Sequence, residues 1–246
     1  MGEAAFAHKA GVHVSAVLKN PRTYEHIPPE WVGNQRRFLV SDVSGRSNLL
    51  AKLQELGVDL SKEEARRLLE EVKALEYEGY AFEGAEASFY LLAHRLKGGS
   101  LPFSVEGFSV FVHGRGLSTA WAEATVRVRV GESLQHTAAE SPFGPVSALD
   151  RAFRKAVLQF YPELSEVELT DYKVRVLEPR KGTAAKVRVL VEWSDHKRSW
   201  STVGVSDNVI EASWRALIDA LRLELMRITE DDETIEKAVE DYCWGV

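Results

Sequence analysis

The feature that most constrains the fold is a sequence unit that occurs twice. The first copy covers about residues 105–160 and the second about residues 168–226. A shift of 64 positions superimposes them and pairs Ala148 with Ala212. A supersecondary unit is repeated in this way when one copy alone cannot bury its apolar face. We therefore predict an α+β fold in which two β-β-β-α units cover each other.

Each copy contains an alternating β segment and one amphipathic helix. Valines alternate with other residues in 125–130 and again in 186–191, which indicates strands buried on one face, and we expect these two segments to correspond. The two helices present apolar stripes at helical spacing. The stripe residues are Val146, Leu149, Phe153, Val157 and Phe160 in the first copy, and Ile210, Trp214, Leu217, Leu221 and Leu225 in the second.

The first hundred residues indicate short helices joined by loops. After a brief helix over about 12–19 and several loops, apolar stripes predict helices over about 48–56, 61–75 and 83–96. Ser61 and Glu64 form a capping-box pattern at the start of one of them. The expected divisions are a linker subdomain (1–50), a helical linker subdomain (51–100), the duplicated domain (101–230) and a C-terminal tail (231–246).

Composition excludes several classes of partner. The formal net charge is −6, which argues against nucleic acid or an anionic membrane as the main partner. There is no apolar run of the roughly 18 residues that a membrane span needs, and no signal-peptide pattern. The single cysteine, Cys243, allows no internal disulfide. We expect a cytoplasmic protein.

The N-terminal histidines do not form a recognisable metal motif. His8 and His13 are five residues apart, without Cys-x-x-Cys or His-Glu-x-x-His spacing, so no metal site is expected in this chain. Nucleotide-binding glycine motifs and a nucleophile elbow are also absent from the sequence. Because residues 2–6 lead directly into a dense run of His, Gly and Lys, the chain resembles the middle of a longer protein.

The starts of the two long helices of the repeat are candidate binding positions. Gly144 and Pro145 precede the first, and Ser206 to Asn208 precede the second. Both starts are typical of ordinary helix caps. The free N–H groups at such a start also suit a carboxylate, and Asp171 is a nearby acid that suits an ammonium group. Together they loosely describe a site for a zwitterion with an apolar tail, such as a branched-chain amino acid.

Several longer motifs resemble one enzyme family. Ala-Phe-Ala-His-Lys-x-Gly-x-His-Val-Ser-Ala-Val, from residue 5, and Ser-Gly-Arg-Ser-Asn, from residue 44, are similar to the segment that follows the catalytic barrel of citramalate synthases. Gly-Pro-Val-Ser-Ala-Leu-Asp and Trp-Ser-Thr-Val-Gly-Val-Ser-Asp-Asn resemble the C-terminal regulatory domain of the same enzymes. The 2-isopropylmalate synthases are similar with a less exact match. The resemblance covers nearly the whole chain.

The resemblance implies a reaction that this chain does not perform alone. In the family, a TIM barrel that is absent from this chain uses a divalent metal to condense an acyl-CoA with a 2-oxo acid, which are acetyl-CoA and pyruvate in citramalate synthases. It implies that His13 and Tyr24 assist a barrel supplied as another domain or subunit. It also implies a homodimer that binds isoleucine or leucine as a feedback inhibitor. The inhibitor-binding positions, with Asp171 added from the argument above, are Gly144, Pro145, Val146, Asp171, Tyr172, Val176, Val205, Ser206 and Asn208.

One departure from the family pattern leaves the inhibitor open. The family commonly has Gly-Asn-Gly-Pro before the first helix, whereas this chain has Phe143 in front of Gly144 and Pro145. We expect Phe143 to narrow the pocket or change its preference. The alternatives are a 2-isopropylmalate synthase portion, a stand-alone amino-acid-binding module, and a dimerisation scaffold without a ligand.

Overall fold

The computed structural model describes residues 6–8, 16–17, 19–38, 53, 58–114, 116 and 120–230. The chain divides into two compact units between Gly99 and Ser100. Each unit is described by itself.

The N-terminal unit is built from short elements, as its turn-rich sequence indicates. Its elements are β1 (Ala7–His8), η2 (Pro21–Thr23), η3 (Pro29–Val32), β2 (Arg37–Phe38), α3 (Lys62–Glu78), η4 (Phe82–Gly84) and α4 (Glu86–Leu96). The strands β1 and β2 pair in parallel. The predicted helices over 12–19 and 48–56 fall largely outside the described residues, although Ala16, Val17 and Lys19 are helical and Leu53 is buried.

The predicted capping box at the start of α3 is confirmed. The Ser61 backbone N–H donates to Glu64 Oε2 at 2.8 Å, and the Glu64 N–H donates to Ser61 Oγ at 3.3 Å. The helix predicted over 83–96 is instead the 3-10 turn η4 followed by α4. Ala85 separates them with a φ of −148°, which is incompatible with one continuous helix.

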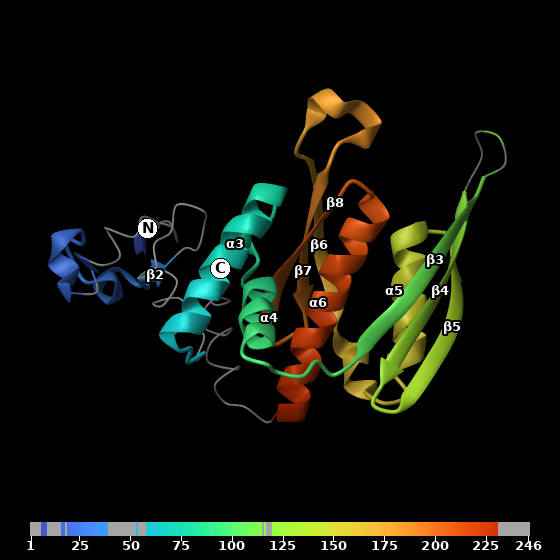
Figure 1. The fold of residues 1–246 in the computed structure, drawn as a ribbon, viewed down its shortest axis with the longest axis horizontal. Helices are drawn as coiled ribbons and strands as arrows, with labels where there is room; N and C mark the ends of the chain where they lie inside the picture. The colour runs from blue at the N-terminus through green and yellow to red at the C-terminus, as the bar shows by residue number, and fades with distance from the viewer. Residues whose placement is uncertain are drawn as a thin grey trace. The chain divides into compact units, whose positions relative to one another are not determined.

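The C-terminal unit consists of the two predicted β-β-β-α copies. The first contains β3 (Ser104–His113), β4 (Trp121–Val130), β5 (Ser133–Ser141) and α5 (Pro145–Val157). The second contains β6 (Glu168–Val176), β7 (Val187–Ser194), β8 (Ser199–Ser206) and α6 (Val209–Glu230), with η5 (Pro162–Glu166) before β6 and η6 (Pro179–Ala184) between β6 and β7. Each copy forms a three-stranded antiparallel sheet with its middle strand in the centre. The helix α5 packs on β4 and β5, α6 packs on β7 and β8, and the helices meet between the sheets (Figure 1).

The two copies repeat each other in detail. The pairing of the first and middle strands is interrupted by an irregularity at Val105/Gly107 in one copy and at Leu169/Asp171, exactly 64 positions later, in the other. Two side-chain bonds also recur. Thr137 Oγ1 donates to the Ala152 carbonyl at 2.6 Å, as Thr202 Oγ1 does to Ala216 at 2.8 Å. Arg151 Nη1 donates to the Glu140 carbonyl at 3.2 Å, as Arg215 Nη1 does to Val205 at 2.7 Å.

The predicted correspondence between the two middle strands is wrong. Phe108 pairs with Val126 and its counterpart Tyr172 pairs with Val191, so Val126 corresponds to Val191 rather than to Val187. The error amounts to four positions. Because the strands repeat with a period of two residues, any even shift aligns their valines equally well. The shift between the two middle strands also depends on the length of the connection that contains η6, and the valine pattern does not report that length.

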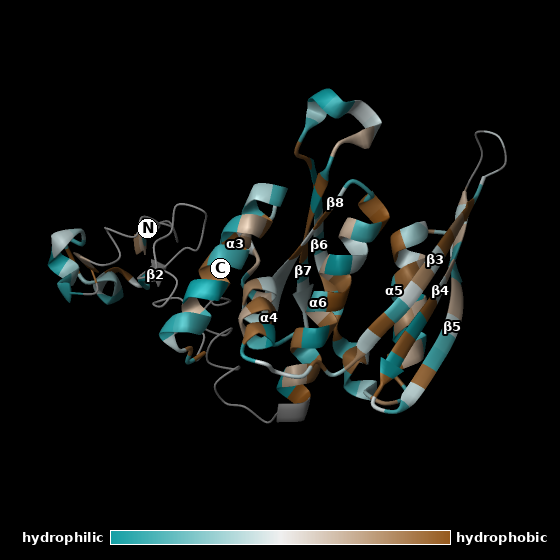
Figure 2. Ribbon diagram, viewed as in Figure 1, coloured by the Kyte–Doolittle hydropathy of each residue, from teal (hydrophilic) through white to brown (hydrophobic). Residues whose placement is uncertain are grey.

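Most residues of the predicted helix stripes belong to the core, whereas Val146 and Ile210 at the helix starts are only partly buried. Leu149, Phe153 and Val157 of α5 are buried, and the predicted α6 positions from Trp214 to Leu225 are buried as well. Phe160 was predicted to belong to the first stripe, but α5 ends at Val157 and the Phe160 side chain is 38% exposed. Figure 2 shows the apolar positions along both helices and the strands. Over the part of the chain that the structure describes, no helix is long and apolar enough to cross a membrane.

Candidate functional site

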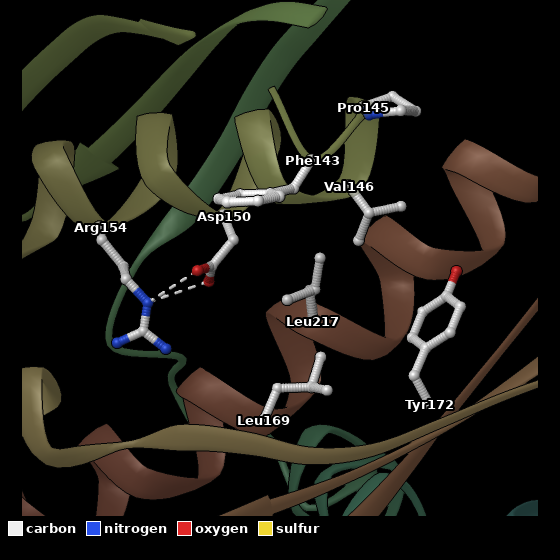
Figure 3. A pocket seen from close by; sticks show the side chains of 9 residues that line it. Phe143, Pro145, Val146, Asp150, Arg154, Leu169, Tyr172 and Leu217 are labelled. Carbon is white, nitrogen blue, oxygen red and sulfur yellow. Dashed lines mark hydrogen bonds and ion pairs between the residues drawn. The ribbon is translucent and has the colours of Figure 1, made fainter. Parts of the chain in front are cut away.

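A pocket of about 460 Å³ lies in the C-terminal unit, where the start of α5 faces β6 and α6 (Figure 3). It combines both copies, because α5 belongs to the first and the other two elements to the second. Its lining residues are Phe143, Pro145, Val146, Ser147, Asp150, Arg154, Leu169, Tyr172 and Leu217. The volume falls within the range of about 300–1,000 Å³ that is typical of small-molecule sites.

The rim of the pocket includes a helix start without a side-chain cap. Gly144 occupies the N-cap position with φ 101° and ψ −175°, a conformation that is essentially restricted to glycine. Among the residues that the structure describes, no side chain caps the start of α5 with a hydrogen bond. The N–H groups of this turn and the positive end of the helix dipole therefore suit an anionic group.

An acid–base pair on α5 supplies the charge of the pocket. Arg154 Nε donates to both carboxylate oxygens of Asp150 at 3.0 Å. The remaining guanidinium nitrogens donate to the carbonyls of Leu164 and Val167, at 2.8 and 2.7 Å. Arg154 thus fixes Asp150 and also ties α5 to the connection that leads into β6. Burial raises the pKa of Asp150 above its usual range, against the opposing effect of the Arg154 charge.

The opposite wall of the pocket is apolar. Leu169 and Tyr172 of β6 and Leu217 of α6 stand across from Val146 (Figure 3). The Tyr172 hydroxyl is held by a hydrogen bond with Ser213 of α6 at 2.5 Å. One carboxylate at one side, a helix start at the rim and an aliphatic wall suit a small zwitterion with an apolar side chain.

The rim residue Phe143 is 80% exposed. Its backbone N–H donates to Ser141 Oγ at 3.1 Å, and the Arg151 guanidinium lies 5.8 Å from the centre of its ring. The Phe143 ring therefore lies at the exposed edge of the pocket lining.

The structure brings together only some of the residues that the sequence predicts for binding. Pro145, Val146 and Tyr172 line the pocket, and Gly144 adjoins them. Asp171 does not line it: the side chain pairs with Lys173 and accepts a hydrogen bond from the Tyr172 N–H. Successive strand residues point to opposite faces, so the strand that directs Tyr172 toward the pocket directs its neighbour away. Val176 lies further along β6 and is also outside the lining.

The predicted residues at the start of α6 have structural partners of their own and do not line the pocket. Asn208 Oδ1 caps the helix by accepting from the Ile210 N–H at 2.9 Å. Ser206 Oγ donates to Glu211 at 2.8 Å, and the Val205 carbonyl accepts from Arg215. The start of α6 is therefore an ordinary capped helix start, which is one of the two interpretations that the sequence allowed.

Five lining residues were not predicted from the sequence: Ser147, Asp150, Arg154, Leu169 and Leu217. The available signal was an Asp and an Arg at i and i+4, with the Asp between Leu149 and Phe153 of the apolar stripe. A charge so close to a buried stripe calls for a partner. Nothing in the sequence indicates that Leu169 and Leu217 face this pair.

The two predicted catalytic residues belong to the N-terminal unit. His13 lies outside the described residues. Tyr24 follows η2 and is 45% exposed. Beside it, buried Glu25 accepts from His8 Nε2 at 3.0 Å and from Arg36 Nε at 2.7 Å, at a pocket of about 620 Å³. Across the described ranges, no three His, Cys, Asp or Glu side chains are grouped so that they could hold a metal ion.

The fold defines the class of this part of the chain as a duplicated β-β-β-α domain with a pocket between its copies. Residues 83–224 match the LeuA allosteric (dimerisation) domain, and the chain belongs to that family. Residues 1–79 match the homocitrate synthase post-HMGL domain-like family.

The curated relatives are more specific. The chain is 52% identical over 235 residues to an (R)-citramalate synthase of Aquifex aeolicus and 50% identical over 234 residues to one of Geobacter sulfurreducens. Each alignment covers 94% of this chain and 44% of the relative. A 2-isopropylmalate synthase of Methanocaldococcus jannaschii is 29% identical over 227 residues, which are 90% of this chain and 41% of the relative. These findings confirm the resemblance to the citramalate synthase and 2-isopropylmalate synthase family, and the chain spans less than half the length of these relatives.

Proposed function

We propose that this chain is the dimerising and allosteric portion of a citramalate synthase-like enzyme, and that the pocket of α5, β6 and α6 binds a branched-chain amino acid as a feedback inhibitor. The single observation that carries the ligand assignment is Asp150 beside the uncapped start of α5, opposite an aliphatic wall. The Asp150 carboxylate would bind the ammonium group, and the N–H groups of the first turn of α5 would bind the carboxylate. Leu169 and Leu217 would contact the side chain.

The catalytic step belongs to a barrel domain or subunit that would condense acetyl-CoA with pyruvate using a divalent metal. Similarity to the citramalate synthases supports this pair of substrates. In this proposal His13 and Tyr24 assist that barrel. Inhibition would follow if the amino acid binds one arrangement of the dimer better than the other, a coupling that is typically about 1–3 kcal/mol.

An incompletely covered apolar row supports the homodimer. Val174 and Val176 pair across the sheet with Val189 and Val187, so they point to the helix side of β6. Yet they are 46% and 49% exposed, because α6 packs on β7 and β8 and leaves the edge strand β6 open. A second copy that covers this row would bury it next to Tyr172.

The test is calorimetric titration of the chain with L-isoleucine and L-leucine, with L-alanine as the control ligand. Asp150→Asn removes the charge that would hold the ammonium group, and we expect it to weaken binding about 10- to 100-fold, since a charge-assisted hydrogen bond contributes about 1.5–3 kcal/mol. Asp171→Asn is the matched control, because that acid lies next to Tyr172 on β6 but does not line the pocket. Equal losses in both variants, or wild-type chain that binds none of these amino acids, would contradict the proposed site.

A further inference from the structure

The pocket has a counterpart in the repeat, and the counterpart is filled. The internal shift of 64 positions makes Trp214 the equivalent of Asp150, Phe108 the equivalent of Tyr172, and Phe153 the equivalent of Leu217. In the open pocket the three residues surround a space. Their counterparts touch instead: the Trp214 ring centre lies 5.4 Å from that of Phe108 and 5.7 Å from that of Phe153.

The tryptophan is the residue that closes this space. Its side chain is 5% exposed and stands between a strand of the first copy and a helix of the same copy, as a ligand in the open pocket would stand between β6 and α6 of the second copy. Phe108 is 37% exposed, so this aromatic cluster also reaches the surface where an entrance would be.

The counterpart helix start is filled as well. Asn208 Oδ1 accepts from the Ile210 N–H at 2.9 Å and caps α6, whereas α5 has no such cap. Glu211 is the equivalent of Ser147 and places a carboxylate in the first turn of α6. Ser206 Oγ at 2.8 Å and Arg215 Nη2 at 2.6 Å hold that carboxylate in place. The start of α6 thus carries an Asn cap and a fixed carboxylate, and the start of α5 has Gly144 and Ser147 at these two positions.

We infer that the second copy contains a permanently occupied version of the amino-acid site, in which Trp214 and Glu211 take the place of the ligand. The duplicated domain therefore binds one amino acid per chain rather than two, and Trp214 is the residue that decides this. The identity of the ligand rests on the proposed function, whereas the filling of the counterpart pocket does not.

The first test is the stoichiometry of L-isoleucine binding to the full 246-residue chain. One isoleucine per chain is expected for the wild type, and two would overturn the inference. Trp214→Asp combined with Glu211→Ser and Asn208→Gly gives the second copy the pocket acid and the uncapped helix start of the first, and its stoichiometry should rise to two. Trp214→Phe, the matched control, should remain at one. A folded triple variant that still binds one isoleucine per chain would also count against the inference.

A second measurement separates this inference from the proposed function. Trp214→Ala leaves an indole-shaped space that opens beside Phe108, and added indole should raise the melting temperature of this variant saturably, with one indole per chain and no effect on the wild type. If Trp214→Ala does not fold, Trp214→Leu titrated with benzene replaces it. Wild-type chain that binds no isoleucine refutes the proposed function, while indole or benzene binding would still support the filled pocket. A folded variant that binds neither would overturn it.

Discussion

Asp150 acts in two ways through one side chain. It is the carboxylate of the pocket, and it is the partner that fixes Arg154, whose other nitrogens hold the chain between α5 and β6. A substitution there therefore changes both the charge of the pocket and the anchoring of its opposite wall. This is why the conservative Asp150→Asn, which keeps an acceptor for Arg154, is more informative than alanine.

The protonation of Asp150 makes ligand binding sensitive to acid. Burial raises the pKa of this carboxyl, so it gains a proton at a higher pH than an exposed aspartate would. Only the ionised form attracts an ammonium group. We expect the affinity for isoleucine to fall as the pH is lowered through the raised pKa, measured by calorimetry at a series of pH values.

Asp171 provides the comparison for that pH series. Its hydrogen bond with Lys173 lowers the pKa of this carboxyl, so it stays ionised over the same range. The pH dependence should disappear in Asp150→Asn and persist in Asp171→Asn. The opposite pattern would assign the ammonium group to Asp171.

Gly144 is the residue whose backbone conformation shapes the rim. At φ 101° a side chain is strained, although nothing lies within 4 Å of the Cβ position. We expect Gly144→Ala to lower the free energy of unfolding by about 1–3 kcal/mol or to shift the helix start and weaken isoleucine binding. Urea denaturation and calorimetry measure the two effects. Gly107→Ala, which is also in open space but without a positive φ, should leave isoleucine binding unchanged; equal behaviour of the two variants would contradict the argument.

At the scale of elements, the two copies share the same hydrogen bonds between strand and helix but differ in how closely strand and helix pack. The same threonine and arginine bonds join strand and helix in both copies. The second copy nevertheless brings β8 and α6 closer at one point. A Cβ atom added to Gly204 would lie 1.9 Å from the Ala212 carbonyl oxygen. The corresponding residue of the first copy is Ala139, because β5 and β8 correspond at a shift of 65, as Thr137 and Thr202 do.

Gly204→Ala should therefore destabilise the second copy. The added methyl group meets helix backbone, which cannot rotate away, and overpacking of this kind costs typically about 1–3 kcal/mol or more. Urea denaturation followed by circular dichroism measures the loss. The reciprocal change Ala139→Gly should cost less, about the 0.5–1 kcal/mol of a strand glycine. A fully stable Gly204→Ala variant would show that β8 and α6 separate without penalty.

At the scale of the whole molecule, each copy covers its middle and last strands with its own helix and leaves its first strand at the edge. The incompletely covered row on β6 points to the helix side. Covering it requires a second chain in the proposed homodimer. Binding and dimerisation would then be linked, because Tyr172 lies in the same row as Val174.

We expect Val174→Asp to weaken the proposed dimer, because it puts a charge into the apolar row. Sedimentation velocity over a range of protein concentrations measures the shift toward monomer. Arg175→Asp is the matched control, since it places the same charge on the same strand but on the opposite face. A dimer that is equally sensitive to both substitutions would place the interface elsewhere.

The sequence alone determined the elements and their duplication. Apolar residues with periods of two and 3.6 fix the strands, the two long helices and their buried faces, and the capping box at Ser61 fixes the start of α3. The same patterns did not identify Val191 as the counterpart of Val126 in the second copy, because strands with a period of two align equally well at any even shift.

Which residues lie next to each other could be seen only in the folded chain. The pocket combines α5 of one copy with β6 and α6 of the other, and periodicity reports which face of an element is apolar but not which element covers it. For that reason the sequence favoured Asp171, which strand alternation turns away, over Asp150, which Arg154 holds at the pocket. For the same reason two similar helix starts differ: one borders an open pocket, and at the other Trp214 fills the space.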